Sequence, residues 1–255
     1  MTSLTKSIHL ELNYIKERGL STLLFILASA LIIVLFSIVA KIRVGWGGFW
    51  ELGYTYYDLL APTIFPLLIL FVTVQMIVLR IVGERAPYGT LDRELIAISR
   101  TGMYFGKLFV HSIIAFIQCI IIYLFGFVFF PVKSYALSPI TIIFLFFLLA
   151  LFGLSLGLLV SIFSRHKESA VQITPYLVLG LFITSLILIF PGVTLSSGVK
   201  VIFMSNPVAL ISQSLSESMI NGVGFEDIGF NIIKIILWII GLTLISLLKF
   251  NFEQK

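Results

Sequence analysis

Charged residues are scarce in this sequence: only 11% of its 255 residues are Asp, Glu, Lys or Arg, whereas 59% are hydrophobic. A soluble domain carries roughly 25% charged residues, which keep its surface solvated. Together with a mean hydropathy of +1.12, this scarcity excludes an ordinary soluble enzyme or binding domain. No polar segment is long enough to form a separate soluble domain, so we expect most of the chain to contact lipid.

Cysteine is nearly absent as well. The one cysteine, Cys119, lies in an apolar run, which excludes a disulfide bond within the chain. The net charge is +5, but the basic residues lie beside apolar runs, as membrane topology requires. They do not form a basic patch on a soluble fold, so we expect no nucleic-acid partner.

Six apolar stretches are each close to the length of about 20 residues that crosses roughly 30 Å of hydrocarbon. They cover residues 20–40, 59–82, 104–129, 139–163, 171–190 and 229–249. The sequence therefore predicts an all-α polytopic membrane protein, in which residues 1–255 form a single transmembrane domain.

Residues 1–19 predict an amphipathic helix that lies in the membrane interface. Its apolar stripe consists of Leu4, Ile8, Leu12 and Ile15. Its other faces carry Lys6, His9, Glu11, Lys16 and Arg18. A cleaved signal peptide is not expected, because the apolar run that follows is long enough to stay in the membrane.

The distribution of Lys and Arg predicts the orientation. If the N-terminus lies inside, twelve of these residues fall on the inner side and five on the outer side. Cytoplasmic loops carry the excess of positive charge in membrane proteins. We therefore expect both termini in the cytoplasm.

The inner connection at 83–103 has the pattern of a short helix at 90–99. Thr90 is a suitable N-cap, and Asp92 and Glu94 suit the first turn of a helix. One apolar face would consist of Leu91, Leu95 and Ile98.

The outer connection at 191–228 predicts a re-entrant helical hairpin. Residues 193–204 are apolar but too short to cross the membrane. Asn206 and Pro207 then provide an N-cap followed by proline at the first helical position. Two short helices that dip into the outer leaflet fit this pattern better than an exposed loop.

Two motifs suggest enzymatic sites but are incomplete. A phosphate-binding loop requires G-x-x-x-x-G-K-[ST]; Gly106 and Lys107 match, but Thr101 replaces the first glycine and Leu108 replaces the hydroxyl residue. The chain is therefore not expected to bind ATP by this route.

The second motif is the G-x-S-x-G match formed by Gly153, Ser155 and Gly157. An intramembrane serine protease would need a histidine from a later span as its base, but the sequence has none in its last two predicted spans. We interpret the two glycines as a surface for close helix packing.

Ionisable residues within the spans are few. Arg80, Lys107 and Lys234 lie close enough to span ends to extend to an interface, and we expect His111 to make a polar structural contact. The sequence has no acidic group near a midplane, which disfavours an ion-coupled secondary transporter.

Several short motifs, taken in order, resemble the membrane subunits of ATP-binding cassette exporters of the type-2 (ABC-2 permease) family. A span that begins near Pro62 ends in an acidic-basic pair, Glu84-Arg85. A Gly-Thr-Leu-acidic-Arg run at 89–93 and a Gly-Lys pair at 106–107 follow. The late Asn206-Pro207 pair before a last span, and the order of one polar helix and six spans, are also similar. The resemblance covers nearly the whole chain, which departs from the family pattern at 87–88.

This resemblance implies a transport subunit that is not itself an enzyme and holds no cofactor or metal. ATP and Mg would bind a separate ATPase, of which two copies dock below two paired permeases in the cytoplasmic membrane of a prokaryote. The short helix would fit a groove of the ATPase. The implied coupling residues are Glu84, Arg85, Gly89, Thr90, Leu91, Asp92, Arg93 and Leu95.

The resemblance also implies a path between the two copies along the first, second and fifth spans. Its candidate lining residues, for which packed or lipid-facing positions are equal alternatives, are Phe65, Gln75, Phe182, Thr184 and Ser185. The hairpin that contains Asn206 and Pro207 would narrow the outer exit. The substrate is expected to be an amphipathic drug, peptide antibiotic or lipid, with a polysaccharide or glycolipid as the alternative.

Overall fold

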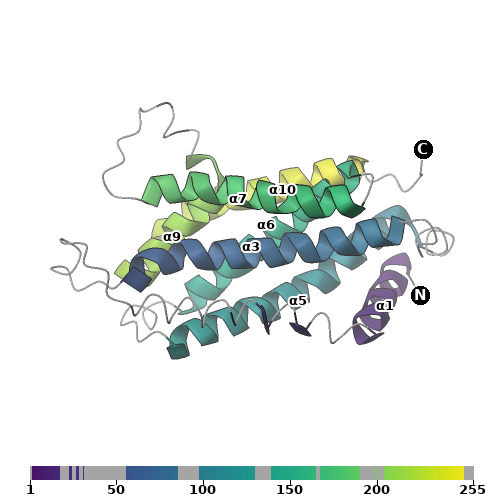
Figure 1. Ribbon diagram of the computed structural model, residues 1–255, viewed down its shortest axis with the longest axis horizontal. Helices are drawn as coiled ribbons and strands as arrows, with labels where there is room; N and C mark the ends of the chain where they lie inside the picture. The colour runs from purple at the N-terminus through teal and green to yellow at the C-terminus, as the bar shows by residue number, and fades with distance from the viewer. Residues whose placement is uncertain are drawn as a thin grey trace.

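The computed structural model describes residues 2–17, 56–85, 98–129, 139–164, 167–189 and 204–249, with a few isolated residues between 23 and 31 and at 198 and 201. Within these ranges the regular structure is entirely helical (Figure 1), which confirms the all-α part of the predicted fold class. The helices are α1 (Ser3–Glu17), α3 (Tyr56–Arg85), α5 (Arg100–Phe129), α6 (Pro139–Phe163), α7 (Lys167–Ile189), α9 (Pro207–Asn221) and α10 (Phe225–Lys249).

Four of the described helices are long and apolar enough to cross a membrane. Their spanning segments are Ala61–Glu84, Thr101–Phe125, Pro139–Phe163 and Phe225–Lys249. These agree within a few residues with four predicted spans, because the hydrocarbon thickness sets the length of an apolar run. The predicted span at 171–190 corresponds to α7, whereas the one at 20–40 lies almost wholly outside the described residues.

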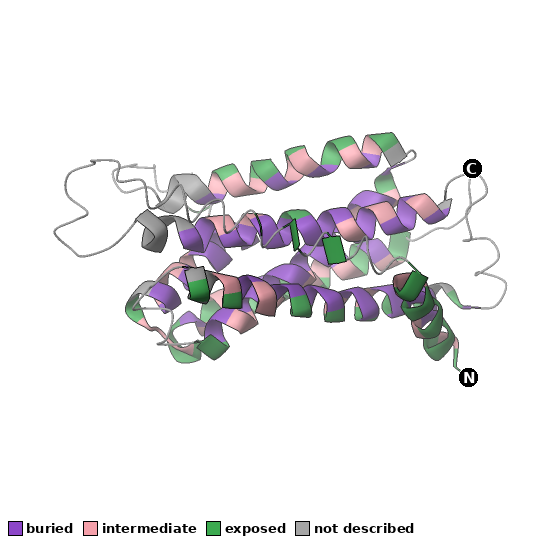
Figure 2. Ribbon diagram, turned by 60° about the horizontal axis from the view of Figure 1, so that its bottom comes forward, coloured by how far each residue is buried: buried purple, intermediate pink, exposed green. Residues whose placement is uncertain are grey.

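The centre of the bundle is formed by α3 and α6, which contact each other more extensively than any other described pair. In the most apolar stretch of α6, 72% of the residues are buried, compared with 17% in α10. In Figure 2 the long helices carry buried residues on some faces and exposed residues on others, and α1 at the N-terminus is largely exposed. Helix α6 is therefore a core helix, and α10 presents most of its apolar surface outward.

Two glycines allow α6 to approach α3 closely. A Cβ at Gly157 would lie 2.9 Å from the backbone oxygen of Val74, and a Cβ at Gly153 would clash with the side chain of Thr73. Between them, Ser155 Oγ lies 3.1 Å from Thr243 Oγ1 of α10. The helix-packing interpretation of this motif is confirmed, and Ser155 joins two helices through a hydroxyl pair.

Helix α9 is a short helix inserted among α3, α6, α7 and α10. Asn206 is its N-cap, with a side-chain oxygen that accepts a hydrogen bond from the Val208 amide at 2.9 Å, and Pro207 follows at the first position. The helix ends at Gly222, where φ is 67°, a backbone conformation that favours glycine. The predicted start of this helix is thus confirmed.

The inner connection is shorter than predicted. Helix α3 continues to Arg85 and α5 begins at Arg100, so the connection covers 86–99 and not 83–103. Residues 86–97 lie outside the described ranges, and with them most of the predicted helix at 90–99. Its last two positions, Ile98 and Ser99, are not helical.

Candidate functional site

Helix α1 packs against the first turns of α5 through small side chains. The Ser99 amide donates a hydrogen bond of 2.7 Å to Ser3 Oγ, and the two serine hydroxyls lie 2.8 Å apart. A Cβ added at Gly102 or at Gly106 would overlap the side chain of Ser3 or of Ser7, respectively. The two glycines therefore allow α1 to lie directly on the surface of α5.

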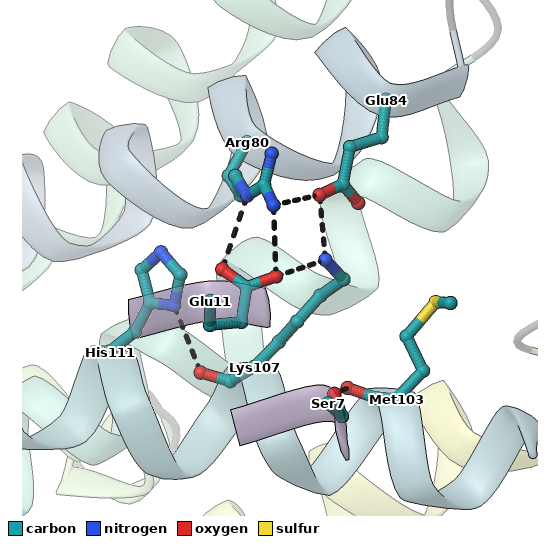
Figure 3. A network of polar contacts seen from close by, with 7 residues as sticks. All are labelled: Ser7, Glu11, Arg80, Glu84, Met103, Lys107 and His111. Atoms are coloured by element: carbon teal, nitrogen blue, oxygen red, sulfur yellow. Dashed lines mark hydrogen bonds and ion pairs between the residues drawn. The ribbon is translucent and has the colours of Figure 1, made fainter. Parts of the chain in front are cut away.

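One turn after Ser7, the next residue on the same face of α1 is Glu11. Its side chain lies between α3 and α5 (Figure 3), and the residue is only 1% exposed. Arg80 of α3 binds it in a bidentate manner, with Nε donating at 3.2 Å and Nη2 at 3.1 Å. Lys107 of α5 donates to the same carboxylate.

A second carboxylate completes the arrangement. Glu84 Oε1 accepts from Lys107 Nζ at 2.7 Å and pairs with Arg80 Nη2 at 2.6 Å. We call these four residues, Glu11, Arg80, Glu84 and Lys107, the charge cluster. None is more than 8% exposed, and the two negative and two positive charges balance.

Two aromatic residues border the charge cluster. The ring of Tyr14 lies 3.5 Å from the guanidinium carbon of Arg80, a cation–π contact from α1. His111 Nδ1 lies 2.9 Å from the backbone oxygen of Lys107 (Figure 3), so His111 makes the polar structural contact that the sequence predicted.

The electrostatics of Glu11 follow from its neighbours. Burial acts to raise the pKa of Glu11, but the positive charges of Lys107 and Arg80 outweigh burial and lower the pKa from 4.5 to about 2. Glu11 is therefore ionised at neutral pH. A buried charge that loses its partner destabilises a protein by about 3–5 kcal/mol, so the cluster holds its helices together as a unit.

The charge cluster lies close to both ends of the inner connection. The connection 86–99 leaves α3 just after Glu84 and enters α5 two turns before Lys107. The cluster thus fixes both ends of that connection to each other and to α1.

Two expectations about charged residues are wrong. Arg80 and Lys107 do not extend to an interface, because their charges are paired inside the protein. Glu11 does not lie on a polar surface of α1; Ser7 and Glu11 form its buried face, whereas Leu4 and Leu12 are exposed. The face of α1 that packs against the bundle therefore carries small and acidic side chains. It is not the face that carries the apolar stripe.

Of the predicted coupling residues, the structure places Glu84 in the charge cluster and Arg85 at the end of α3. The other six lie outside the described residues: Gly89, Thr90, Leu91, Asp92, Arg93 and Leu95. Glu11, Arg80 and Lys107 belong to the charge cluster but were not among the predicted coupling residues. The available signal was the four-residue spacing of Ser3, Ser7 and Glu11, together with that of Gly102 and Gly106, which Lys107 follows directly.

The candidate path residues lie on two helices. Phe65 is fully buried in α3, with its ring 5.8 Å from that of Phe146 in an edge-to-face arrangement. Gln75, also in α3, is 9% exposed. In α7, Ser185 is buried and donates to the Phe182 oxygen at 2.7 Å.

Thr184 of α7 belongs to a different contact. Asn206 Nδ2 donates to Thr184 Oγ1 and, at 2.9 Å, to the Leu181 oxygen. The N-cap of α9 is therefore bound to α7 through side-chain hydrogen bonds.

The long apolar helices indicate a multi-pass membrane protein. The charge cluster lies at the end of its bundle where α3 ends and α5 begins. A family model described as ABC-2 family transporter protein matches residues 51–248, and the chain belongs to this family. The family comprises membrane subunits of ATP-binding cassette exporters, which work with a separate ATPase. No curated protein matches the chain significantly. Within the described ranges, no group of three His, Cys, Asp or Glu side chains is arranged to hold a metal ion.

Proposed function

We propose that the chain is the path-forming subunit of an exporter in a prokaryotic cytoplasmic membrane, with two copies paired above two copies of an ATPase. The observation that carries the coupling mechanism is the charge cluster. It joins α1, α3 and α5 at the point where the 86–99 connection leaves and re-enters the bundle. In this proposal the connection contacts the ATPase, and the cluster carries ATPase closure into the spans.

The proposed topology has six spans, with α7 as the fifth and residues 20–40 as the first. Helix α7 has 23 residues, which is enough to cross the hydrocarbon. Helix α1, the end of α3, the start of α5 and the end of α10 lie at the same end of the bundle (Figure 1). This supports a cytoplasmic location for both termini, on the side where the ATPase binds.

At the opposite end, α9 and the residues before it form the proposed outer gate. Asn206 and Pro207 begin α9, and Asn206 binds α7 at Leu181 and Thr184. A movement of α7 is therefore transmitted to the start of α9. The proposed path runs beside α7 and α3, with Phe65, Gln75, Phe182, Thr184 and Ser185 as its candidate lining residues.

The proposed substrate is amphipathic: a drug, a peptide antibiotic or a lipid. The abundance of apolar and aromatic side chains supports this choice, since 14% of the residues are Phe, Trp or Tyr. Because aromatic rings also stack on sugars, a polysaccharide or glycolipid is the second candidate.

The test uses the chain co-expressed with its ATPase, for which the neighbouring genes are the first place to search. The double variant Asp92→Arg/Arg93→Asp preserves net charge but reverses each charge in the coupling segment. We expect normal insertion, with ATP hydrolysis no longer linked to export. The matched control exchanges Glu226 and Lys249, the charges at the two ends of α10. Unchanged export in the Asp92/Arg93 variant would exclude this segment from coupling.

A further inference from the structure

Helix α1 has three faces, and only one of them packs against the bundle. This docked face carries the side chains that contact α3 and α5, namely Ser3, Ser7, Glu11 and Tyr14. Roughly a quarter of the way around the helix lies the apolar stripe, which consists of Leu4, Ile8, Leu12 and Ile15. The third face is polar, and its basic residues Lys6, His9 and Lys16 are all exposed. The apolar stripe and the basic face therefore lie largely at the surface of the described structure.

The contacts of the docked face place α1 at one end of the spans. Ser7 Oγ donates to the Met103 backbone oxygen at 3.4 Å and lies directly against Gly106. Both α5 residues belong to the first two turns of the span Thr101–Phe125, and the α3 span Ala61–Glu84 ends in the charge cluster. Helix α1 crosses this end of the bundle at an angle to α3 and α5 (Figure 1). Its depth is therefore that of the boundary between hydrocarbon and headgroups.

The exposed leucines of the apolar stripe indicate a bilayer rather than water around this side of α1. Leu4 is 41% exposed and Leu12 is 51% exposed. An interfacial helix buries such side chains in the acyl region and keeps its polar face among the headgroups. At about 100° per residue, Lys16 points away from the docked face, and Lys6 points away from the apolar stripe. With the stripe in the hydrocarbon, both lysines extend to the headgroups.

The charges on α1 indicate which headgroups fit. Its two acidic residues differ, because Glu11 is buried in the charge cluster whereas Glu17 is exposed at the end of the helix. Neither Lys6 nor Lys16 forms an ion pair with a described carboxylate. Docking thus hides one negative charge and leaves the exposed surface of α1 with two lysines against one glutamate. This surface is therefore net positive, which is the charge that anionic lipids attract.

We propose that the exposed surface of α1 binds anionic phospholipids in the leaflet at its end of the bundle. The apolar stripe lies among the acyl chains, and the ammonium groups of Lys6 and Lys16 pair with the negative headgroups. Helix α1 is then held from two sides, by the charge cluster within the protein and by lipid outside it. The lipid composition of that leaflet therefore affects how firmly α1 is attached.

The test is photo-cross-linking of the full-length protein in phosphatidylcholine nanodiscs. One sample carries a small fraction of phosphatidylglycerol with a photoactivatable headgroup, and the other carries the equivalent phosphatidylcholine probe. Peptide mapping then measures the labelling of α1. We expect the phosphatidylglycerol probe to label α1 in preference, and Lys6→Gln/Lys16→Gln to lower this preference about fivefold for each lysine, the factor that corresponds to roughly 1 kcal/mol for one lysine near an anionic surface.

The matched control, Lys234→Gln/Lys249→Gln, removes the same charge from α10 and should leave the labelling of α1 unchanged. A second variant, Leu4→Gln/Leu12→Gln, should lower labelling by both probes, because the stripe no longer enters the acyl region. The substitutions on α1 lie at exposed positions, so folding is preserved. Equal labelling by the two probes, or an unchanged preference in the lysine variant, would overturn the proposal. Loss of α1 labelling when the ATPase binds would also overturn it, since the basic face would then belong to the protein partner.

Discussion

Replacement of Glu11 by glutamine removes one charge from the charge cluster and keeps the shape of the side chain. Arg80 and Lys107 then share only Glu84, so one positive charge is buried without a partner. Such a change costs about 3–5 kcal/mol. The pKa of Glu11 gives a similar magnitude, because a shift from 4.5 to about 2 corresponds to about 3 kcal/mol of stability at neutral pH. We expect α1 to detach from α5 and the protein to unfold more readily.

The assay is denaturant unfolding in detergent, combined with hydrogen exchange of the α1 amides. Glu17→Gln is the matched control, because Glu17 lies on the same helix but is exposed. The double variant Glu11→Gln/Lys107→Met restores charge balance and should recover much of the lost stability. If Glu11→Gln costs no more than Glu17→Gln, the cluster does not hold α1 in place and the reasoning is refuted.

Three further predictions concern the charge cluster, the α1–α5 contact and the α3–α6 contact. The stability that Glu11 contributes should be complete above its ordinary pKa of 4.5 and should be lost as the pH falls towards about 2; hydrogen exchange of α1 across this range measures it, and a loss already at pH 6 would contradict it. Gly106→Val should displace α1 because the added atoms overlap Ser7, whereas Gly83→Val, where no atom lies within 4 Å, should not; α1 exchange that is equally slow in both variants would contradict the docking. Gly157→Leu should destabilise the α3–α6 contact by several kcal/mol through overlap with the Val74 backbone, whereas Gly180→Leu, at an open position, should be nearly neutral in the same unfolding assay.

Four of the predicted spans and the cap of α9 were predictable because their signals are local. The length of an apolar run is set by the membrane, and Asn206-Pro207 is a cap in any helical context. The charge cluster was not predictable in this way. Glu11 lies 69 positions before Arg80 and 96 before Lys107. In the sequence, Glu11 resembles any acidic residue on the polar face of an amphipathic helix.

The face by which α1 docks was misjudged for a related reason. Hydrophobic periodicity assumes that apolar side chains are the ones a helix buries. In a membrane protein, lipid can cover the apolar stripe, and the protein contact is left to small residues. Ser3 and Ser7 against Gly102 and Gly106 follow this second rule.

The central claim is that the charge cluster carries ATPase movement into the spans. It is tested most directly by the distance between spin labels at Asn221→Cys of two paired copies, measured with and without trapped nucleotide. Asn221 is exposed at the end of α9, and the native Cys119 is fully buried, so the label is confined to the intended site. We predict a nucleotide-dependent change in distance that Glu17→Gln retains and Glu11→Gln loses, although ATP hydrolysis continues. A full distance change in Glu11→Gln would contradict the account.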